Sequence, residues 1–175
     1  MIFHKTKIVG LYIIEAEPIK DNRGYFAKIF DIKEFKKNGI DFKLVGANKS
    51  FNAKKGTLRG MHFQKAPKSE DKIVQCIKGA IFDVAVDMRP KSKTYGKWIA
   101  VELTEDNNKM FLIPKGFAHG FQTLADSCEV MYFMSEHYSP KHASGLRWDD
   151  PFLKIKWPLP VSVLSEKDKN WPLIT

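Results

Sequence analysis

Short apolar segments, separated at close spacing by turn residues, run through most of the 175-residue chain and constrain its fold more than any other feature. The residues between them are rich in Gly, Pro, Asn and Asp, which favour the backbone angles of tight turns. Segments of this length and spacing are typical of strands in an antiparallel sandwich or barrel. The sequence therefore predicts an all-β fold. The expected strand segments are residues 7–16, 24–30, 42–51, 57–64, 72–88, 97–104, 109–116, 119–124 and 129–138.

Two short segments favour a helix instead. Residues 31–39 begin with Asp31 as an N-cap, carry Glu34 three positions later and end at Gly39, which is the pattern of a capped helix. A second short helix is expected at residues 165–168. The tail from residue 142 onward is rich in Trp and Pro and is expected to wrap the sheets.

The composition is that of a globular protein, with 43% hydrophobic and 28% charged residues. No apolar run approaches the roughly 18 residues that span a bilayer, and the N-terminus lacks the apolar stretch of a secretory signal. We therefore expect no membrane partner and a cytoplasmic location. Because no repeat or linker interrupts the chain, residues 1–175 are expected to form a single domain. Cys76 and Cys128 lie in apolar runs, which predicts buried free thiols.

The formal net charge of +9 raises the question of a nucleic-acid partner. The lysines are scattered along the chain and form no basic helix or compact basic tract. A lysine-rich solvated surface with one site for a small anionic substrate explains this pattern better. We therefore expect no nucleic-acid partner.

Alternation along the strands places polar side chains among apolar ones. In a strand, a side chain shares its face with the side chains two positions away. Lys72, Asp83 and Tyr132 each fall on an otherwise apolar face, and we expect them to point into an enclosed space. The three faces hold Lys72, Val74 and Cys76; Ile81, Asp83 and Ala85; and Val130, Tyr132 and Met134. The opposite face of the strand that carries Asp83 holds Phe82, Val84 and Val86.

The stretch RGMHFQ, residues 59–64, contains two polar residues in an apolar strand. Strict alternation puts Arg59 and His62 on opposite faces of that strand. A bulge at Gly60 brings both side chains to one side. We therefore expect Arg59 and His62 to face the same cavity.

Seven residues are candidates for a functional site, and each also has an ordinary structural explanation. A histidine in a strand is more often a hydrogen-bonded core residue than a catalyst, a tyrosine can simply pack, and a buried aspartate can pair with a structural cation. Several such groups are hard to satisfy separately in one core, because an unpaired buried polar group is costly. One shared, partly hydrated cavity accommodates them all. The candidates are Arg59, His62, Lys72, Asp83, His119, Tyr132 and, in the tail, Asp168.

This combination suits the removal of a proton next to a carbonyl group. His62 is the candidate base, Lys72 a cation for the enolate oxygen, and Tyr132 a second proton carrier on the opposite side of the substrate. His62 and His119 have no histidine partner at HxH or HxxxH spacing, so we expect no metal. The chain also has no nucleophile elbow, dinucleotide fingerprint or phosphate-binding loop, so we expect no cofactor.

Motifs along nearly the whole chain occur in an order that identifies a family. They are DNRGYF (21–26), NKS (48–50), LRGMHFQ (58–64), Lys72, GAIFDVAVDMR (79–89), KTYGKW (93–98), IPKGFAHGFQTL (113–124), Tyr132, HYSP (137–140), WDDP (148–151), KWP (156–158) and SEKD (165–168). Any one of them is weak, but the set is specific. In these motifs the chain resembles the dTDP-4-dehydrorhamnose 3,5-epimerase family, which are sugar-nucleotide epimerases of the cupin superfamily.

The resemblance implies a cupin-type jelly roll with a few short helices, no metal, and a homodimer that exchanges N-terminal strands. It implies a nucleotide-linked 4-keto-6-deoxy sugar as substrate, with dTDP as the nucleotide. His62 would be the base at C3 or C5, oriented by Asp168, with Tyr132 as the acid and Lys72 stabilising the enolate at O4. The implied substrate-binding residues are Arg23, Phe26, Asn48, Arg59, Asp83, His119 and Tyr138, with Arg23 and Phe26 serving the neighbouring subunit's site.

The chain departs from the family pattern in the pocket expected to bind the base and sugar of the nucleotide. Lys28 stands where the family usually has a glutamate, and Gly46 where it often has a glutamine. The charge reversal at Lys28 leaves the nucleotide open among dTDP, UDP, CDP and GDP. Directly before Lys72, Glu70 and Asp71 replace residues that are usually neutral.

Three other functions stay open at this point. A 3,4-ketoisomerase on the same scaffold would move the carbonyl group instead of inverting a centre. A non-catalytic module that binds sugar nucleotides or nucleic acid fits the net charge, and a metal-dependent cupin is a further alternative. Within the epimerase hypothesis, inversion at C3, at C5 or at both carbons fits the same base and acid.

Overall fold

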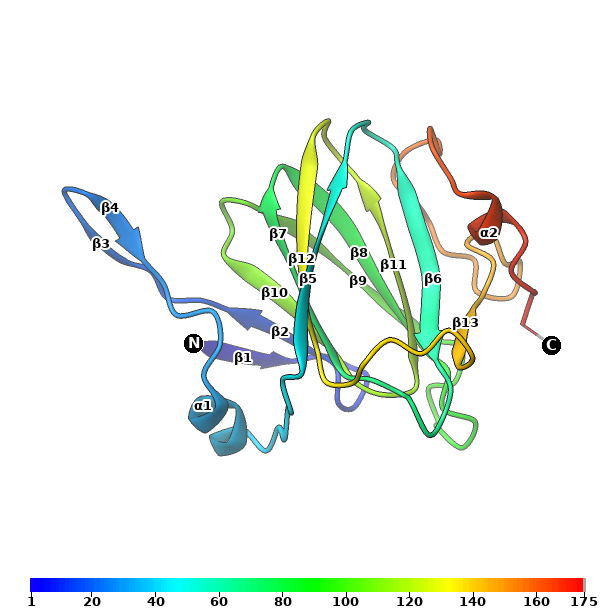
Figure 1. Cartoon of the computed structure of the whole chain (residues 1–175), viewed down its shortest axis with the longest axis horizontal. Coiled ribbons are helices and arrows are strands. Elements are labelled where there is room, and N and C mark those ends of the chain that lie inside the picture. The colour runs from blue at the N-terminus through cyan, green and yellow to red at the C-terminus, as the bar shows by residue number, and fades with distance from the viewer. Residues whose placement is uncertain (175) are drawn as a thin grey trace.

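The computed structural model describes residues 1–174 and confirms the all-β prediction. Two antiparallel sheets face each other in a jelly roll of the cupin type (Figure 1). The six-stranded sheet has the order β1 (Ile2–Lys5), β2 (Tyr12–Glu15), β10 (Lys109–Ile113), β7 (Lys72–Lys78), β12 (Cys128–Met134) and β5 (Gly46–Asn52). The five-stranded sheet has the order β13 (Ala143–Gly145), β6 (Leu58–Gln64), β11 (Phe117–Thr123), β8 (Ala80–Asp87) and β9 (Trp98–Thr104).

The faces predicted from alternation are confirmed. Val74 and Val130 of the six-stranded sheet and Ile81 and Ala85 of the five-stranded sheet belong to one buried cluster, which fills the space between the sheets. The cluster also contains Cys76 and Cys128, and both are buried free thiols, as predicted. Because Lys72, Asp83 and Tyr132 alternate in step with these residues, they point into the sandwich.

The outer faces of both sheets are covered by other parts of the chain. Residues 27–42, with Phe35 and Phe42 fully buried, pack on the outside of the six-stranded sheet. The tail covers the five-stranded sheet, where Leu153 and Trp157 pack near Val84 and Val86. The predicted wrapping of the sandwich by the tail is therefore confirmed. No helix among residues 1–174 has the length and apolar character needed to cross a membrane.

Both predicted helices are present. In α1 (Ile32–Lys37), the Asp31 side chain accepts hydrogen bonds from the backbone N–H groups of Lys33 at 2.8 Å and Glu34 at 3.4 Å, which confirms the N-cap. In α2 (Glu166–Lys169), the Ser165 hydroxyl accepts a hydrogen bond from the backbone N–H of Asp168 at 3.1 Å. This cap fixes the position of Asp168 next to β6.

Three strands lie outside the predicted segments: β1, β3 (Ile19–Asp21) and β13. With β4 (Gly24–Phe26), β3 forms a hairpin that projects away from the two sheets (Figure 1). Its apolar side chains are exposed, with Ile19 at 72%, Tyr25 at 60% and Phe26 at 69%. Exposed apolar surface of this kind commonly marks an interaction site.

The bulge predicted at Gly60 is confirmed. His62 pairs with His119 of β11, whereas Arg59, three positions earlier on β6, pairs with Phe121, only two positions later on β11. The extra residue on β6 puts Arg59 and His62 on the same face of the strand. Gly60 has φ +132°, a conformation that other residues rarely adopt.

A Gly60→Ala substitution is expected to destabilise the fold, because the new Cβ would lie 2.5 Å from the Cα of Gly120 and 2.9 Å from the carbonyl oxygen of His119. Gly24→Ala is the matched control, since Gly24 has a similar φ of +126° and no atom within 4 Å of where the new methyl group would lie. In urea denaturation, the Gly60 variant should lose about 1–3 kcal/mol more free energy of unfolding than the control, which is the usual cost of overpacking. Equal losses in the two variants would show that β6 and β11 do not need this close approach.

Candidate active site

A cavity of about 520 Å³ opens between β6, the start of β7 and the tail segment around α2. Five of the predicted site residues line it: Arg59, His62, Lys72, Tyr138 and Asp168. They come from positions separated by up to 109 residues in the chain, so the fold rather than local sequence brings them together. A narrow crevice that shares His62 and Lys72 continues to His119.

His62 and Asp168 form the pair expected from the family resemblance. The Nε2 atom of His62 lies 2.6 Å from Oδ1 of Asp168. The carboxylate also accepts hydrogen bonds from the backbone N–H of Gly60 at 3.3 Å and from Nε1 of Trp171 at 3.2 Å. An ionised carboxylate only accepts hydrogen bonds, so the Nε2 atom of His62 carries the proton and the other ring nitrogen is free to act as a base.

The electrostatics of Asp168 favour its ionised form. Burial alone would raise the pKa of this carboxyl group, but the hydrogen bond and charge of His62, with smaller contributions from Gly60 and Ser165, hold the pKa below its ordinary value. Asp168 is therefore a carboxylate at neutral pH and orients the His62 ring without taking its proton.

Lys72 begins β7, and its side chain is largely buried at the junction of the cavity and the crevice. Its Nζ atom lies 3.2 Å from Oε1 of Glu70. Lys72 is therefore a fixed cation inside the cavity.

A second histidine–carboxylate pair lies beside the first. The Nε2 atom of His119 is 2.6 Å from Oδ1 of Asp83, and both residues are buried. Complete burial raises the pKa of Asp83, while the neighbouring His119 and Lys72 counteract part of this effect. Because His119 pairs with His62 across β6 and β11, the two imidazoles stand next to each other on the same sheet.

Tyr132 lies on β12 of the opposite sheet, and its side chain points into the sandwich beside His119, with ring centroids 6.4 Å apart. Neither Tyr132 nor Asp83 lines the cavity or the crevice, so these two spaces do not hold all seven candidates, as the sequence predicted of one cavity. The Tyr132 hydroxyl group is 2.9 Å from the Ser50 hydroxyl. Burial raises the pKa of the phenol to about 12, and the Ser50 hydrogen bond offsets only part of this effect. Tyr132 is therefore a neutral phenol, able to donate a proton, over the whole physiological pH range. The candidate base and the candidate acid come from opposite walls of the sandwich.

Six of the predicted binding residues do not line the cavity, although His119 lines the adjoining crevice: Arg23, Phe26, Lys28, Asn48, Asp83 and His119. Arg23 and Phe26 lie on the β3–β4 hairpin, where Arg23 pairs with Asp21 of the same hairpin and both residues of that pair are exposed. Asn48 is exposed on β5, directly opposite Tyr132 of β12. Within one chain, the hairpin residues are separate from the cavity.

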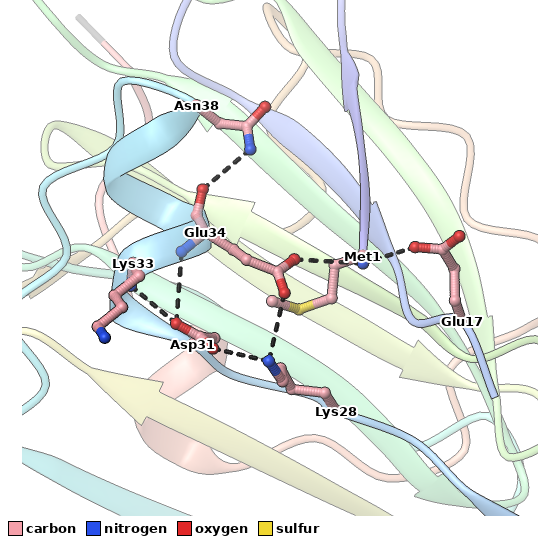
Figure 2. A network of polar contacts seen from close by, with 7 residues as sticks. All are labelled: Met1, Glu17, Lys28, Asp31, Lys33, Glu34 and Asn38. Carbon is pink, nitrogen blue, oxygen red and sulfur yellow. Dashed lines mark hydrogen bonds and ion pairs between the residues drawn. The ribbon is translucent and has the colours of Figure 1, made fainter. Parts of the chain in front are cut away.

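Lys28 takes part in an ionic network at the N-terminal end of α1 (Figure 2). Its Nζ atom lies 2.8 Å from the Asp31 carboxylate and 3.4 Å from that of Glu34. The N-terminal ammonium group of Met1 joins the same network, 3.3 Å from Glu34 and 2.6 Å from Glu17. The charge introduced at Lys28 therefore has its counter-charges within the same chain.

Several residues of the site were not singled out from the sequence. Trp171 donates to Asp168 and packs edge-on against His62, with ring centroids 6.2 Å apart. Lys167 lines the cavity, and Ser50 is the hydroxyl partner of Tyr132. Gln64 also lines the cavity, although it is part of the RGMHFQ stretch. Ser50 and Gln64 lie in the NKS and LRGMHFQ motifs and Trp171 follows Asp168 by three residues in a Trp-rich tail, so these three residues had a signal in the sequence.

Comparisons with known proteins agree with this geometry. The family model described as dTDP-4-dehydrorhamnose 3,5-epimerase matches residues 5–175. The chain is 47% identical over 172 residues to the dTDP-4-dehydrorhamnose 3,5-epimerase of Methanothermobacter thermautotrophicus, covering 97% of this chain and 92% of the relative.

Two solved structures share the fold over nearly their full length. The dTDP-4-dehydrorhamnose 3,5-epimerase of Bacillus anthracis, solved with TDP and PPi bound, has a TM-score of 0.95 and 41% identity, covering 97% of each chain. The dTDP-6-deoxy-D-glucose-3,5-epimerase of Legionella pneumophila, solved in complex with dTDP-4-keto-L-rhamnose, has a TM-score of 0.92 and 39% identity, covering 98% of this chain and 91% of that one.

Proposed function

Since this chain belongs to the dTDP-4-dehydrorhamnose 3,5-epimerase family, we propose that it inverts C3 and C5 of a dTDP-linked 4-keto-6-deoxy sugar by acid–base chemistry. It is an isomerase of deoxysugar biosynthesis. The observation that carries the proposed mechanism is the placement of His62 and Tyr132 on opposite walls of the sandwich. A base and an acid on opposite sides of a sugar ring are the requirement for inverting a carbon centre.

The first step is removal of a proton next to the C4 carbonyl group. The free ring nitrogen of His62 takes the proton from C3 or C5, and the electron pair of that C–H bond forms an enolate with its charge on O4. Lys72 lines the same cavity as His62 and supplies a positive charge for this oxygen. Asp168 stabilises the imidazolium ion that forms.

The second step is reprotonation from the other side. The Tyr132 phenol donates its proton to the planar carbon, the enolate electron pair forms the new C–H bond, and the C4 carbonyl is restored. The Tyr132 phenol stays protonated until it is used, because its pKa is about 12. His62 then loses its proton to solvent and Tyr132 regains one.

The nucleotide is proposed to extend from the sugar toward Arg59 and Tyr138, which line the cavity. The Arg59 side chain is held by Asn52, whose Oδ1 accepts a hydrogen bond from Nε at 2.6 Å. An oriented guanidinium group suits a diphosphate, because it offers several donors in one plane. The choice of dTDP as the nucleotide is supported by the ligands named for the related structures. It is also supported by the ion pair of Lys28 with Asp31, because the positive charge that replaces the family's usual glutamate is balanced within the chain.

We further propose that residues 1–175 act as one domain, that the chain forms a homodimer in the cytoplasm, and that each β3–β4 hairpin completes the partner's site. The hairpin carries exposed apolar side chains and projects away from its own sheets. Arg23 would reach the diphosphate and Phe26 the base of the nucleotide in the neighbouring subunit.

Mixing two inactive variants tests the shared site. Arg23→Ala should reduce activity in the partner's site, and His62→Ala in the site of its own chain. After joint unfolding and refolding in equal amounts, mixed dimers contain one site with both residues intact, so the mixture should recover about a quarter of wild-type activity if the dimer is two-fold symmetric. A mixture no more active than the separate variants would show that Arg23 serves its own chain.

Product analysis by NMR tests the reaction itself. With dTDP-4-keto-6-deoxyglucose, the protein should give a product that keeps its ketone at C4 and has inverted configuration at C3 and C5. A ketone at C3 would establish the ketoisomerase alternative. Tight binding without any change in the sugar would establish the non-catalytic alternative.

A further inference from the structure

Glu70 is a buried carboxylate inside the cavity that the mechanism above does not use. It lies in residues 65–71, which connect β6 to β7, and lines both the cavity and the crevice. Its side chain is only 8% exposed, and its Oε1 atom is 3.2 Å from the Nζ atom of Lys72, whose side chain is 13% exposed. Burial of a charge is costly without a partner, so the two groups depend on each other.

Glu70 is itself held in place by Gln64, the last residue of β6. The side-chain amide of Gln64 donates to Oε2 of Glu70 at 3.1 Å and to the backbone carbonyl of Lys68 at 2.9 Å. Its oxygen accepts a hydrogen bond from the backbone N–H of Ser139 at 2.6 Å. The carboxylate is therefore anchored at both oxygens, with one to Lys72 and one to the strand that also carries His62.

A lysine needs such an anchor to act as a fixed electrostatic group. Its ammonium sits on a flexible four-carbon stem, and a free lysine samples many rotamers. The ion pair with Glu70, with 3.2 Å between the nitrogen and the carboxylate oxygen, restrains the Lys72 ammonium group inside the cavity. Preorganised donors stabilise a developing oxyanion, because they need no rearrangement during the reaction.

We propose that Glu70 is a positioning residue that holds the Lys72 ammonium at the site of the enolate oxygen. This inference rests on the proposed function, in which Lys72 stabilises that oxygen. Glu70 does not touch the substrate in this scheme, and its whole effect passes through Lys72.

Glu70→Ala should reduce kcat about 10- to 100-fold, the usual range for a misplaced catalytic group, and change KM by less than about twofold. Glu70→Gln keeps an oxygen that can accept from Lys72 and should recover part of the loss. Glu136→Ala is the matched control, because Glu136 also pairs with a lysine but does not line the cavity. Its Oε1 atom lies 3.3 Å from Nζ of Lys68, which belongs to the same segment, 65–71, as Glu70. The control variant should keep wild-type kinetics.

A double-mutant cycle with Lys72→Met decides whether Glu70 acts through Lys72. If it does, Glu70→Ala has no further effect once Lys72 is replaced. An equal fold-loss in both backgrounds, or an Ala variant with wild-type kcat, would overturn the proposal. If Glu70→Ala does not fold, as judged by its thermal unfolding, Glu70→Gln enters the same cycle. An unaltered rate in Lys72→Met alone would refute the proposed role of Lys72, and the proposal for Glu70 would fall with it, whereas a slowed Lys72→Met without coupling would overturn the Glu70 proposal alone.

Discussion

In the His62→Ala variant, the C3 and C5 hydrogens of the sugar are expected to exchange with solvent about a thousandfold more slowly than in the wild type. This is the usual contribution of a general base to a rate. The ring nitrogen opposite the Asp168 contact is the free base in the part of the cavity proposed to receive the sugar. Exchange is followed by NMR in D₂O with dTDP-4-keto-6-deoxyglucose. His4→Ala is the matched control, since His4 also pairs with a carboxylate, Glu15 at 3.4 Å, but lies outside the cavity.

The control should exchange at the wild-type rate. A His62→Ala rate within tenfold of wild type would mean that another group removes the proton, with the His119–Asp83 pair as the nearest alternative. Tyr132→Phe should differ in kind from His62→Ala. It should still allow exchange from the His62 side while losing most of the inversion, because the phenol acts only in the reprotonation step.

Lys72→Met is expected to reduce kcat about 100- to 1000-fold, as does the loss of one oxyanion-stabilising donor in other enzymes. Methionine fills the space of the lysine stem but carries no charge, so KM should change little. The kinetic constants are measured with the same substrate. Lys68→Met is the control, because Lys68 also pairs with a glutamate but is more exposed. Equal kcat values for the two variants would remove Lys72 from the mechanism.

The fold was largely predictable, because the sandwich buries one face of each long strand. Alternating side chains then leave a pattern in the sequence, and the assignment of Asp83 and Tyr132 to inward faces followed from it. The α1 cap was predictable for a similar reason, since Asp31 and its partners are local in the chain. The bulge at Gly60 could be predicted because strict alternation would put Arg59 and His62 on opposite faces, whereas their chemistry suits one cavity.

The strands that were missed have physical reasons for leaving no pattern. β13 consists of Ala143, Ser144 and Gly145, which have no strand preference, and it forms because the edge of β6 is available for pairing. β3 is exposed along its whole length, so no burial shaped its sequence. Propensity alone does not find such strands, because tertiary contacts decide them.

The candidate site was predictable in its residue types but not in its pairings. His62 and Asp168 are 106 positions apart, and only the family resemblance connected them. The contact of Lys72 with Glu70 was also not foreseen, although Glu70 and Asp71 stood out before Lys72 in the sequence. Lys28 was expected to face the nucleotide, and its pairing with Asp31 and Glu34 within the same chain was not foreseen (Figure 2). Pairings of this kind depend on three-dimensional distance, which strand alternation does not encode.

Solvent deuterium incorporation by the wild-type protein tests the central claim most directly. In D₂O, dTDP-4-keto-6-deoxyglucose should gain deuterium at C3 and C5 in step with inversion at those carbons, because each inverted centre receives its new hydrogen from solvent through Tyr132. Inversion without deuterium at the inverted carbon, or no incorporation at either position, would contradict an enolate mechanism with His62 as the base.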